Sequence, residues 1–325
     1  MNDYRLVAQA FGGPEVIVAE PIAAQPVLAG KARVRHRAIG VNFIDTYHRT
    51  GLYPQPLPAA LGVEAAGVIE ALGDGVANLS VGQRVAYASS APGSYASWRD
   101  VDADRLLVLP DDIDDETAAA ATLKGLTART LIFGCAQMAA GQSALVHAAA
   151  GGVGRLLVQW LAAIGVSVIA HSGSPEKAAI ARGLGADHSL DCSYEALSAE
   201  IRAATDGRGV DVVFDGVGAA SWEASLDSLR PRGLMISFGN ASGPVPPVSP
   251  LELARRGSLF LTRPRLFDYI ADKAERDAAA AALFATIGAG KLDIEIALRL
   301  PLDRAAEAHR ALERRHTSGS VILIP

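Results

Sequence analysis

Between residues 142 and 261 the sequence alternates short apolar runs with longer segments of helical spacing. The apolar runs have the length and β-branched composition of strands, and they are residues 144–148, 167–170, 210–214 and 234–238. Residues 153–163 and 176–184 carry the helical spacing between them. Strands that alternate with helices of this length form βαβ units, and such units build a parallel, doubly wound sheet. We therefore predict an α/β domain in this part of the chain.

The first third of the chain, residues 4–109, has a different pattern. Short alternating runs such as residues 32–38 are separated by turns rich in glycine and proline, which is typical of a β-rich, barrel-like domain. An acid-rich helix start at residues 111–117 marks the junction. The closing segments can return to this domain, with helices at 273–287 and 304–315 and a strand at 320–325. The predicted domains are residues 1–122, completed by 266–325, and residues 123–265.

Composition limits the partners and the location. The 325 residues carry a net charge of −5 and no basic stripe, so nucleic acid is not expected as the main partner. No apolar run is long enough to cross a membrane and the start of the chain lacks a secretory pattern, so we expect a cytoplasmic protein. Cys135 and Cys192 are the two cysteines, and they can form neither a disulfide framework nor a multi-cysteine zinc site.

A glycine-rich turn joins the first strand of the α/β region directly to an apolar helix. In this turn Gly151 would let the backbone approach phosphates, and Gly154 would let the helix pack closely on the strand. The helix start would supply amide donors to a pyrophosphate. Ala149 stands where the usual fingerprint has its first glycine. An ordinary tight turn is the alternative interpretation, but the βαβ context favours a dinucleotide site.

The end of the second strand indicates which dinucleotide binds. An NAD enzyme usually carries an acid here, but the expected position near Gly173 has none. Ser172, Ser174 and Lys177 can instead cradle a 2′-phosphate, which favours NADPH. Glu176 is the main objection, although an acid in the first turn of a helix is explained by the helix dipole. The alternative for Lys177 is a solvated helix lysine.

Six segments, spaced along the whole chain, resemble one family. They are residues 40–54, 62–67, 124–127, 148–154, 233–240 and 315–325. In this order they resemble the NADPH:quinone oxidoreductases, the zeta-crystallin-like, zinc-free branch of the medium-chain dehydrogenase/reductase superfamily. The resemblance implies a GroES-like, β-rich substrate domain and a Rossmann nucleotide domain.

The zinc alcohol dehydrogenases of that superfamily hold a catalytic metal with Cys, His and Cys. Alignment on the motifs places Asn42, Val63 and Lys124 at these positions. Valine cannot bind a metal and an ammonium group repels one, so we expect no metal and no metal-assisted alcohol oxidation.

The stretch from Asn42 to Tyr53 places an amide, a carboxylate and two phenols just after a strand, which is typical of an active-site rim. The predicted catalytic residues are Asn42, Asp45, Tyr47, Tyr53 and Lys124. The resemblance implies that Asn42 and Tyr47 lie beside the nicotinamide and that Tyr53 lines the acceptor pocket. Tyr47 or a water molecule can donate a proton to a reduced oxygen. The alternatives are a helix cap or a salt bridge for Asp45 and simple packing for the tyrosines.

The resemblance also implies which residues bind the dinucleotide. The predicted set is Asn42, Tyr47, Thr127, Ala150, Gly151, Gly152, Val153, Gly154, Ser172, Gly173, Ser174, Lys177, Phe238, Gly239, Asn240 and Arg315. A guanidinium such as that of Arg315 can bind the 2′-phosphate through two hydrogen bonds. Cys192 stands where family members often have a tyrosine near the adenine, which weakens the expected preference for NADPH over NADH.

Reduction of quinones by NADPH is the predicted function, because a quinone accepts reducing equivalents without a strong Lewis acid. The same scaffold also serves reduction of α,β-unsaturated carbonyl compounds, which is the first alternative. The second is a non-catalytic protein that binds NADPH or RNA. An apolar strand at residues 257–262 would form a sheet edge, and such an edge favours a homodimer.

Overall fold

The computed structural model of the chain describes residues 3–23, 25–315 and 317–325. Met1, Asn2 and His316, which belong to the terminal segments considered above, lie outside the described residues. Two units of structure are present: unit 1 is Met1–Leu126, Ile270–Gly288 and Ile294–Pro325, and unit 2 is Thr127–Tyr269 and Ala289–Asp293. The domain limits given above stay a prediction. Among the described residues, no helix combines the length and the apolar character that crossing a membrane requires.

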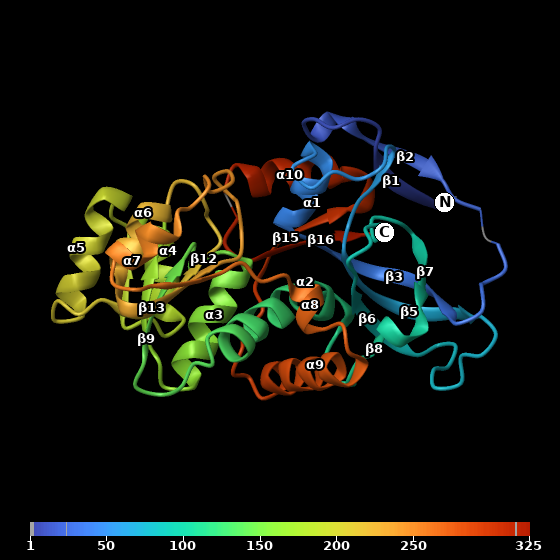
Figure 1. Ribbon diagram of the computed structural model, residues 1–325. Helices are drawn as coiled ribbons and strands as arrows, with labels where there is room; N and C mark the ends of the chain where they lie inside the picture. Colours follow the sequence, from blue (N-terminus) through green and yellow to red (C-terminus); the bar gives the residue numbers. More distant parts are fainter. Residues whose placement is uncertain (1–2, 24, 316) are drawn as a thin grey trace. The chain divides into compact units, whose positions relative to one another are not determined.

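Unit 2 is built on a six-stranded parallel sheet (Figure 1). Its strands are β9 (Ser143–His147), β10 (Ser167–His171), β11 (His188–Leu190), β12 (Val210–Asp215), β13 (Leu229–Ser237) and β14 (Phe260–Thr262). They lie in the order β11-β10-β9-β12-β13-β14, which is the strand order of a doubly wound Rossmann sheet. The predicted α/β architecture is therefore confirmed.

The helices of unit 2 alternate with these strands. They are α3 (Gly152–Ala163), α4 (Pro175–Gly183), α5 (Tyr194–Ala204), α6 (Trp222–Ser228), α7 (Pro250–Arg255) and α8 (Leu266–Tyr269). Helix α3 forms because Leu157, Val158 and Leu161 present one apolar face to the sheet, and all three side chains are buried. Ser174 caps α4, where Pro175 follows at the first helical position.

Unit 1 is β-rich and contains two sheets (Figure 1). The larger contains β3 (Lys31–Val41), β5 (Glu64–Leu72), β6 (Arg84–Ala88), β7 (Trp98–Asp102), β8 (Leu107–Val108), β15 (Ile296–Pro301) and β16 (Ser320–Ile324). The smaller contains β1 (Tyr4–Ala8), β2 (Ile17–Pro21) and β4 (Ala59–Ala60). Strand β16 pairs with β3 and β15 pairs with β16, so the end of the chain completes the larger sheet. This arrangement is the expected GroES-like domain.

The helical segments around these sheets are short, apart from two. They are α1 (Phe43–Thr50), α2 (Asp115–Arg129), α9 (Lys273–Gly288) and α10 (Ala305–Glu313), with 3₁₀ turns η1 (Pro14–Val16), η2 (Ala103–Arg105) and η4 (Leu302–Arg304). The α-helix α2 ends at Arg129, and a π-helical segment, η3 (Thr130–Cys135), follows it.

Candidate active site

Helix α1 begins at the stretch that the sequence singled out. Asn42 is its N-cap, and the Asn42 main-chain N–H donates to the Asp45 carboxylate at 2.8 Å. This reciprocal arrangement fixes the start of the helix. Gly51 ends the helix in the left-handed conformation, with φ of 82°. Asp45 is therefore a helix cap, as its alternative interpretation held, and its part in catalysis stays a prediction.

A buried carboxylate that the sequence did not single out joins two of the predicted catalytic residues. Glu64, the first residue of β5, is fully buried. Its Oε1 accepts hydrogen bonds from Asn42 Nδ2 at 2.7 Å and from Lys124 Nζ at 3.1 Å. Its Oε2 accepts the main-chain N–H of Leu123 at 2.6 Å. An acid within the apolar run 61–69 was the available signal, since buried carboxylates need partners.

A chain of buried hydrogen bonds leads away from Asp45 to helix α10. Because arginine only donates, Arg49 Nη1 donates to His309 Nδ1 at 3.2 Å, and His309 Nε2 must carry its proton. His309 Nε2 then donates to Tyr95 Oη at 3.0 Å, and Tyr95 donates to Asp45 Oδ2 at 3.1 Å. Arg49 is also paired with Glu313. The direction of every proton in this chain is therefore fixed.

Burial shifts the pKa values of two members of this chain, Asp45 and His309. Burial raises the pKa of the Asp45 carboxyl to about 7, and the neighbouring Glu64 carboxylate raises it as well. Asp45 Oδ1 has no hydrogen-bond partner in the described part of the chain. Burial, with a smaller contribution from the Arg49 cation, lowers the pKa of His309 to about 3. His309 is therefore neutral at neutral pH, and Asp45 titrates there.

The two predicted tyrosines lie together. The rings of Tyr47 and Tyr53 meet edge to face, with 5.2 Å between their centroids. The main-chain N–H of Tyr53 donates to the carbonyl of Tyr47 at 3.1 Å. Both side chains are half-buried, so part of each ring stays exposed.

In unit 2 the glycine turn follows the last residue of β9, at the carboxyl edge of the parallel sheet. Gly151 is the N-cap of α3, which begins at Gly152, so amide donors of the first turn point out of the helix start. A Cβ at position 154 would lie 2.2 Å from the carbonyl oxygen of Ala148. Only glycine fits there, as predicted for close packing of helix on strand.

The turn after β10 carries the residues predicted to bind a 2′-phosphate. Ser172 is buried, and its hydroxyl has no hydrogen-bond partner among the described residues. Gly173 is exposed, and a Cβ there would meet open space. Ser174 caps α4 by accepting the main-chain N–H of Lys177 at 3.4 Å. This polar turn, which lacks a carboxylate between Ser172 and Ser174, fits a phosphate ester.

Residues 238–240 follow β13 at the same edge of the sheet. The N–H of Phe238 donates to the carbonyl of Asp215 at 2.8 Å, and a Cβ on Gly239 would lie 2.3 Å from the carbonyl oxygen of Gly216. The carboxyl edge of the sheet in unit 2 thus brings together the predicted residues 150–154, 172–174 and 238–240. Thr127 lies in α2, and Arg315 follows α10 in unit 1, so the 2′-phosphate role of Arg315 stays a prediction.

A second buried carboxylate, also missed from the sequence, lies beneath this edge. Asp215 Oδ1 accepts the N–H groups of Val217 at 2.7 Å and Gly218 at 3.1 Å. Its Oδ2 accepts the hydroxyls of Ser221 at 2.6 Å and Ser225 at 2.7 Å. Ser225 Oγ also bonds His147 Nε2 at 2.9 Å, so His147 donates.

The consequence for His147 is a fixed neutral ring. Burial lowers the pKa of His147 to about 4, although the Asp215 carboxylate opposes this shift. The ring packs edge to face on His171 with 5.3 Å between centroids. The ends of β9, β10 and β12 are therefore tied together beneath the glycine turn.

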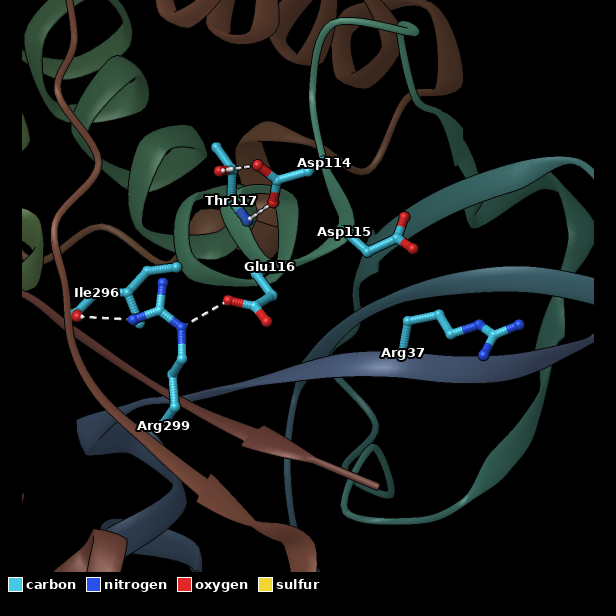
Figure 2. Close-up of a pocket in the computed structure, with 7 residues that line it drawn as sticks. All are labelled: Arg37, Asp114, Asp115, Glu116, Thr117, Ile296 and Arg299. Atoms are coloured by element: carbon cyan, nitrogen blue, oxygen red, sulfur yellow. Dashed lines mark hydrogen bonds and ion pairs between the residues drawn. The ribbon is translucent and has the colours of Figure 1, made fainter.

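A charged pocket lies in unit 1, at the start of α2 (Figure 2). Its lining residues are Arg37, Asp114, Asp115, Glu116, Thr117, Ile296 and Arg299. Asp114 accepts hydrogen bonds from Thr117, and Arg299 is paired with Glu116 at 2.6 Å. Its contacts support the local fold, and we assign it no function.

The donor set does not fit a zinc ion at the positions where zinc dehydrogenases hold one. Val63 is apolar and buried, Asn42 turns its amide nitrogen to Glu64, and the Lys124 ammonium is paired with the same carboxylate. Within the described ranges, no group of three or more His, Cys, Asp or Glu side chains is placed to hold a metal. These side chains therefore support no metal-dependent step, and the expected absence of a metal stays a prediction.

Two family models match the chain. Residues 28–111 match the alcohol dehydrogenase GroES-like domain, and residues 152–282 match the model described as zinc-binding dehydrogenase. With the Rossmann sheet and the glycine turn described above, these matches define a member of the medium-chain dehydrogenase/reductase class.

Individual relatives narrow the class. A quinone oxidoreductase of Pseudomonas aeruginosa is 47% identical over 324 residues, 99% of both chains. The solved structure of Escherichia coli quinone oxidoreductase complexed with NADPH superposes with a TM-score of 0.96 at 42% identity, covering 99% of this chain and 100% of that one. A 2-haloacrylate reductase of Burkholderia sp. is 41% identical over 97% of this chain and 96% of its own length. The chain belongs to the quinone oxidoreductase family.

Proposed function

We propose that this protein is an NADPH:quinone oxidoreductase that works without a metal. The observation that carries the proposal is the full-length match to quinone oxidoreductases. Two features of the structure support it. The carboxyl edge of the sheet in unit 2 has a glycine turn that fits a phosphate, and Asn42, Glu64 and Lys124 in unit 1 form a cluster that does not fit a metal ion. When bound, NADPH supplies the hydride that reduces the acceptor.

The residues of unit 2 would hold the dinucleotide. The N–H groups at the start of α3, beside Gly151 and Gly152, would donate hydrogen bonds to the pyrophosphate. The orphan hydroxyl of Ser172 and the cation of Lys177 would bind the 2′-phosphate. These roles, like those of Phe238 and Asn240 in unit 2 and of Arg315 in unit 1, are part of the proposal.

The residues of unit 1 would orient the acceptor and control its proton. Asn42 turns its Nδ2 to Glu64, which holds the amide in one orientation at the start of α1. The Lys124 ammonium would stabilise negative charge that develops on a carbonyl oxygen of the acceptor. The paired rings of Tyr47 and Tyr53 would stack on a flat acceptor, and the Tyr47 hydroxyl would donate a proton.

The proposal is tested by following NADPH absorbance in metal-free buffer with an ortho-quinone, a para-quinone and a 2-alkenal in turn. Rapid oxidation with either quinone is expected, and NADPH is expected to be preferred over NADH. In Lys177→Ala, KM for NADPH should rise about tenfold with little change for NADH, since one charge-assisted phosphate contact is lost. Tight NADPH binding without turnover of any acceptor would contradict the proposal.

Reduction of an activated carbon–carbon double bond is the second candidate. The relative from Burkholderia, a 2-haloacrylate reductase, favours it, because it covers almost the whole chain. Turnover of 2-chloroacrylate or the 2-alkenal without turnover of quinones would move the assignment to this reaction.

We also propose a homodimer and a cytoplasmic location. Strand β14 is the edge of the sheet in unit 2, and Phe260 on it is 61% exposed, so the edge offers both backbone groups and an apolar side chain to a second copy. The mass in solution, measured by light scattering, should be twice that of the chain and should halve in Phe260→Asp. The two free thiols support a reducing compartment, which cell fractionation checks.

A further inference from the structure

Glu64 is a fully buried carboxylate whose partners are two of the residues proposed to act on the acceptor. Its Oε1 receives Asn42 Nδ2 and Lys124 Nζ, and its Oε2 receives the N–H of Leu123. Lys124 is itself buried, with 7% of its side chain exposed. All four residues lie in unit 1, on β5, on α2 and at the start of α1.

These contacts decide which way the Asn42 amide faces. A carboxylate can only accept hydrogen bonds, so the NH₂ group of Asn42 must point to Glu64. The carbonyl oxygen of the amide is then turned to the other side. The capping box at the start of α1 agrees with this orientation, because its other half uses the Asn42 side chain as an acceptor.

The same carboxylate holds the ammonium of Lys124. A buried cation needs a counter-charge, because removing a charged group from water is costly. The 3.1 Å ion pair with Glu64 supplies that counter-charge and fixes the position of Nζ. An ammonium in a fixed place is more useful to a reacting oxygen than a mobile one.

The backbone around Glu64 is shaped to accept this side chain. A Cβ on Gly40 would lie 2.2 Å from Glu64 Oε1 and 2.3 Å from the carbonyl oxygen of Ala119. No residue other than glycine leaves room for the carboxylate at this point of β3. This close approach of Gly40 is an observation independent of the hydrogen bonds. It shows that the Glu64 carboxylate occupies the space beside Gly40 in one position.

We infer that Glu64 is a positioning residue for acceptor reduction, which turns the Asn42 amide and holds the Lys124 ammonium without touching the acceptor itself. The inference rests on the proposed function. It adds a residue that acts through two others.

Glu64→Gln tests it, because glutamine has the same shape but brings an NH₂ group to a place where three donors converge. We expect kcat for quinone reduction to fall about 10- to 100-fold, as misplaced reacting groups typically cost. The Kd for NADPH, measured by fluorescence titration, should stay within about threefold, because the turns that would hold the phosphates lie in unit 2.

The comparison of kcat with the Kd for NADPH separates positioning from simple structural damage. Loss of positioning should lower kcat and leave the Kd unchanged, whereas a variant that is merely less well folded should lose active protein and keep kcat per folded molecule. In Glu64→Asp the charge remains but the reach is shorter, so kcat should fall less than in Glu64→Gln.

Asp211→Asn is the matched control. Asp211 is also a buried carboxylate, bound by Ser143, Arg208 and Arg230 at the start of β12. This variant should lose stability and keep kcat and the Kd for NADPH. If Glu64→Gln does not fold, Glu64→Asp carries the test through its kcat.

Three outcomes are decisive. A kcat within about twofold of wild type in Glu64→Gln, or an unchanged kcat in Glu64→Asp where Glu64→Gln does not fold, would overturn the inference alone. If the wild-type protein reduces none of the quinones with NADPH, the proposed function is wrong and the inference fails with it. If kcat falls as much in Asp211→Asn as in Glu64→Gln, the inference is wrong, because the effect would then follow from the loss of any buried carboxylate.

Discussion

Glu64 in unit 1 and Asp215 in unit 2 are both fully buried carboxylates, but they are stabilised in different ways. Glu64 has one cation, the Lys124 ammonium, besides an amide NH₂ and a main-chain N–H. Asp215 has four neutral donors, two main-chain N–H groups and two serine hydroxyls. Both arrangements offset the loss of water around a carboxylate.

The difference shows what each site can be used for. Neutral donors spread over a loop and a helix make Asp215 a fixed tie between elements, and no single donor is decisive. The ion pair makes Glu64 and Lys124 depend on each other, because losing either partner leaves an uncompensated buried charge. A site with one decisive cation is suited to chemistry, and a site with many equal donors is suited to holding a fold.

The largest effect is expected from removing the cation. Lys124→Met should lower the free energy of unfolding by about 3–5 kcal/mol, because Glu64 is left buried without its counter-charge. Urea denaturation measures this, and Glu64→Gln with Lys124→Met should recover part of the loss. A decrease below about 1 kcal/mol would mean that the two sites do not differ in this way.

Asp45 extends the comparison to a buried carboxyl whose donors, in the part of the chain that the structure describes, are the main-chain N–H of Asn42 and the Tyr95 hydroxyl. Its pKa in the folded protein, about 7, lies above the ordinary value, so its contribution to stability is present at acid pH and is lost as pH rises through neutrality. Asp45→Asn removes this dependence. Between about pH 5 and pH 8 the variant should gain about 2–3 kcal/mol relative to wild type.

The measurement is the free energy of unfolding of both proteins at several pH values. The pKa values of His36, His147 and His309 are lowered, in contrast to that of Asp45. These histidines therefore make the protein less stable as pH falls below about 6.5. They are common to both proteins and cancel in the difference. A difference that does not change with pH would show that Asp45 does not titrate near neutrality.

Loss of one neutral donor at Asp215 should cost less than loss of the cation at Glu64. Ser225→Ala should lower the free energy of unfolding by about 1–2 kcal/mol, because Asp215 keeps three donors while His147 loses its acceptor. Ser228→Ala is the matched control in the same helix, since its hydroxyl bonds only the carbonyl of Ala224. Equal losses would show that the network around Asp215 adds nothing.

The smallest effect belongs to an exposed pair. Arg299 and Glu116 are paired at 2.6 Å with about half of each side chain exposed. Glu116→Gln should change the free energy of unfolding by no more than about 0.5 kcal/mol, because water screens the pair. A larger change in urea denaturation would mean that exposure does not separate this pair from the buried ones.

The sequence predicted the fold well where the pattern was local. Buried parallel strands are nearly continuous apolar runs, so β9, β10 and β12 could be found within a residue or two of their observed ends. Strand β11 and helix α5 were not predicted, because His188–Leu190 is short and half-polar and the helix Tyr194–Ala204 is largely exposed. The change to a π-helix after Arg129 leaves the apolar spacing almost unaltered, so no pattern marks it.

The candidate site was predictable only in part. A turn that accepts a phosphate needs glycines in a row, which a sequence shows directly. The network of Asp45, Tyr95 and His309 joins residues 50 and 214 positions apart, and Glu64 meets Lys124 across 60 positions. Contacts of this kind depend on how strands and helices are brought together, so the residues could be named as polar but not assigned to partners.

The space at Gly40 also limits how this chain can change. The missing Cβ at position 40 leaves room both for the Glu64 carboxylate and for the carbonyl oxygen of Ala119. A shorter side chain at position 64 would remove only the first of these clashes, and it would also release Asn42 and Lys124. A library that varies positions 40 and 64 together to alter acceptor preference should therefore still retain glycine at position 40.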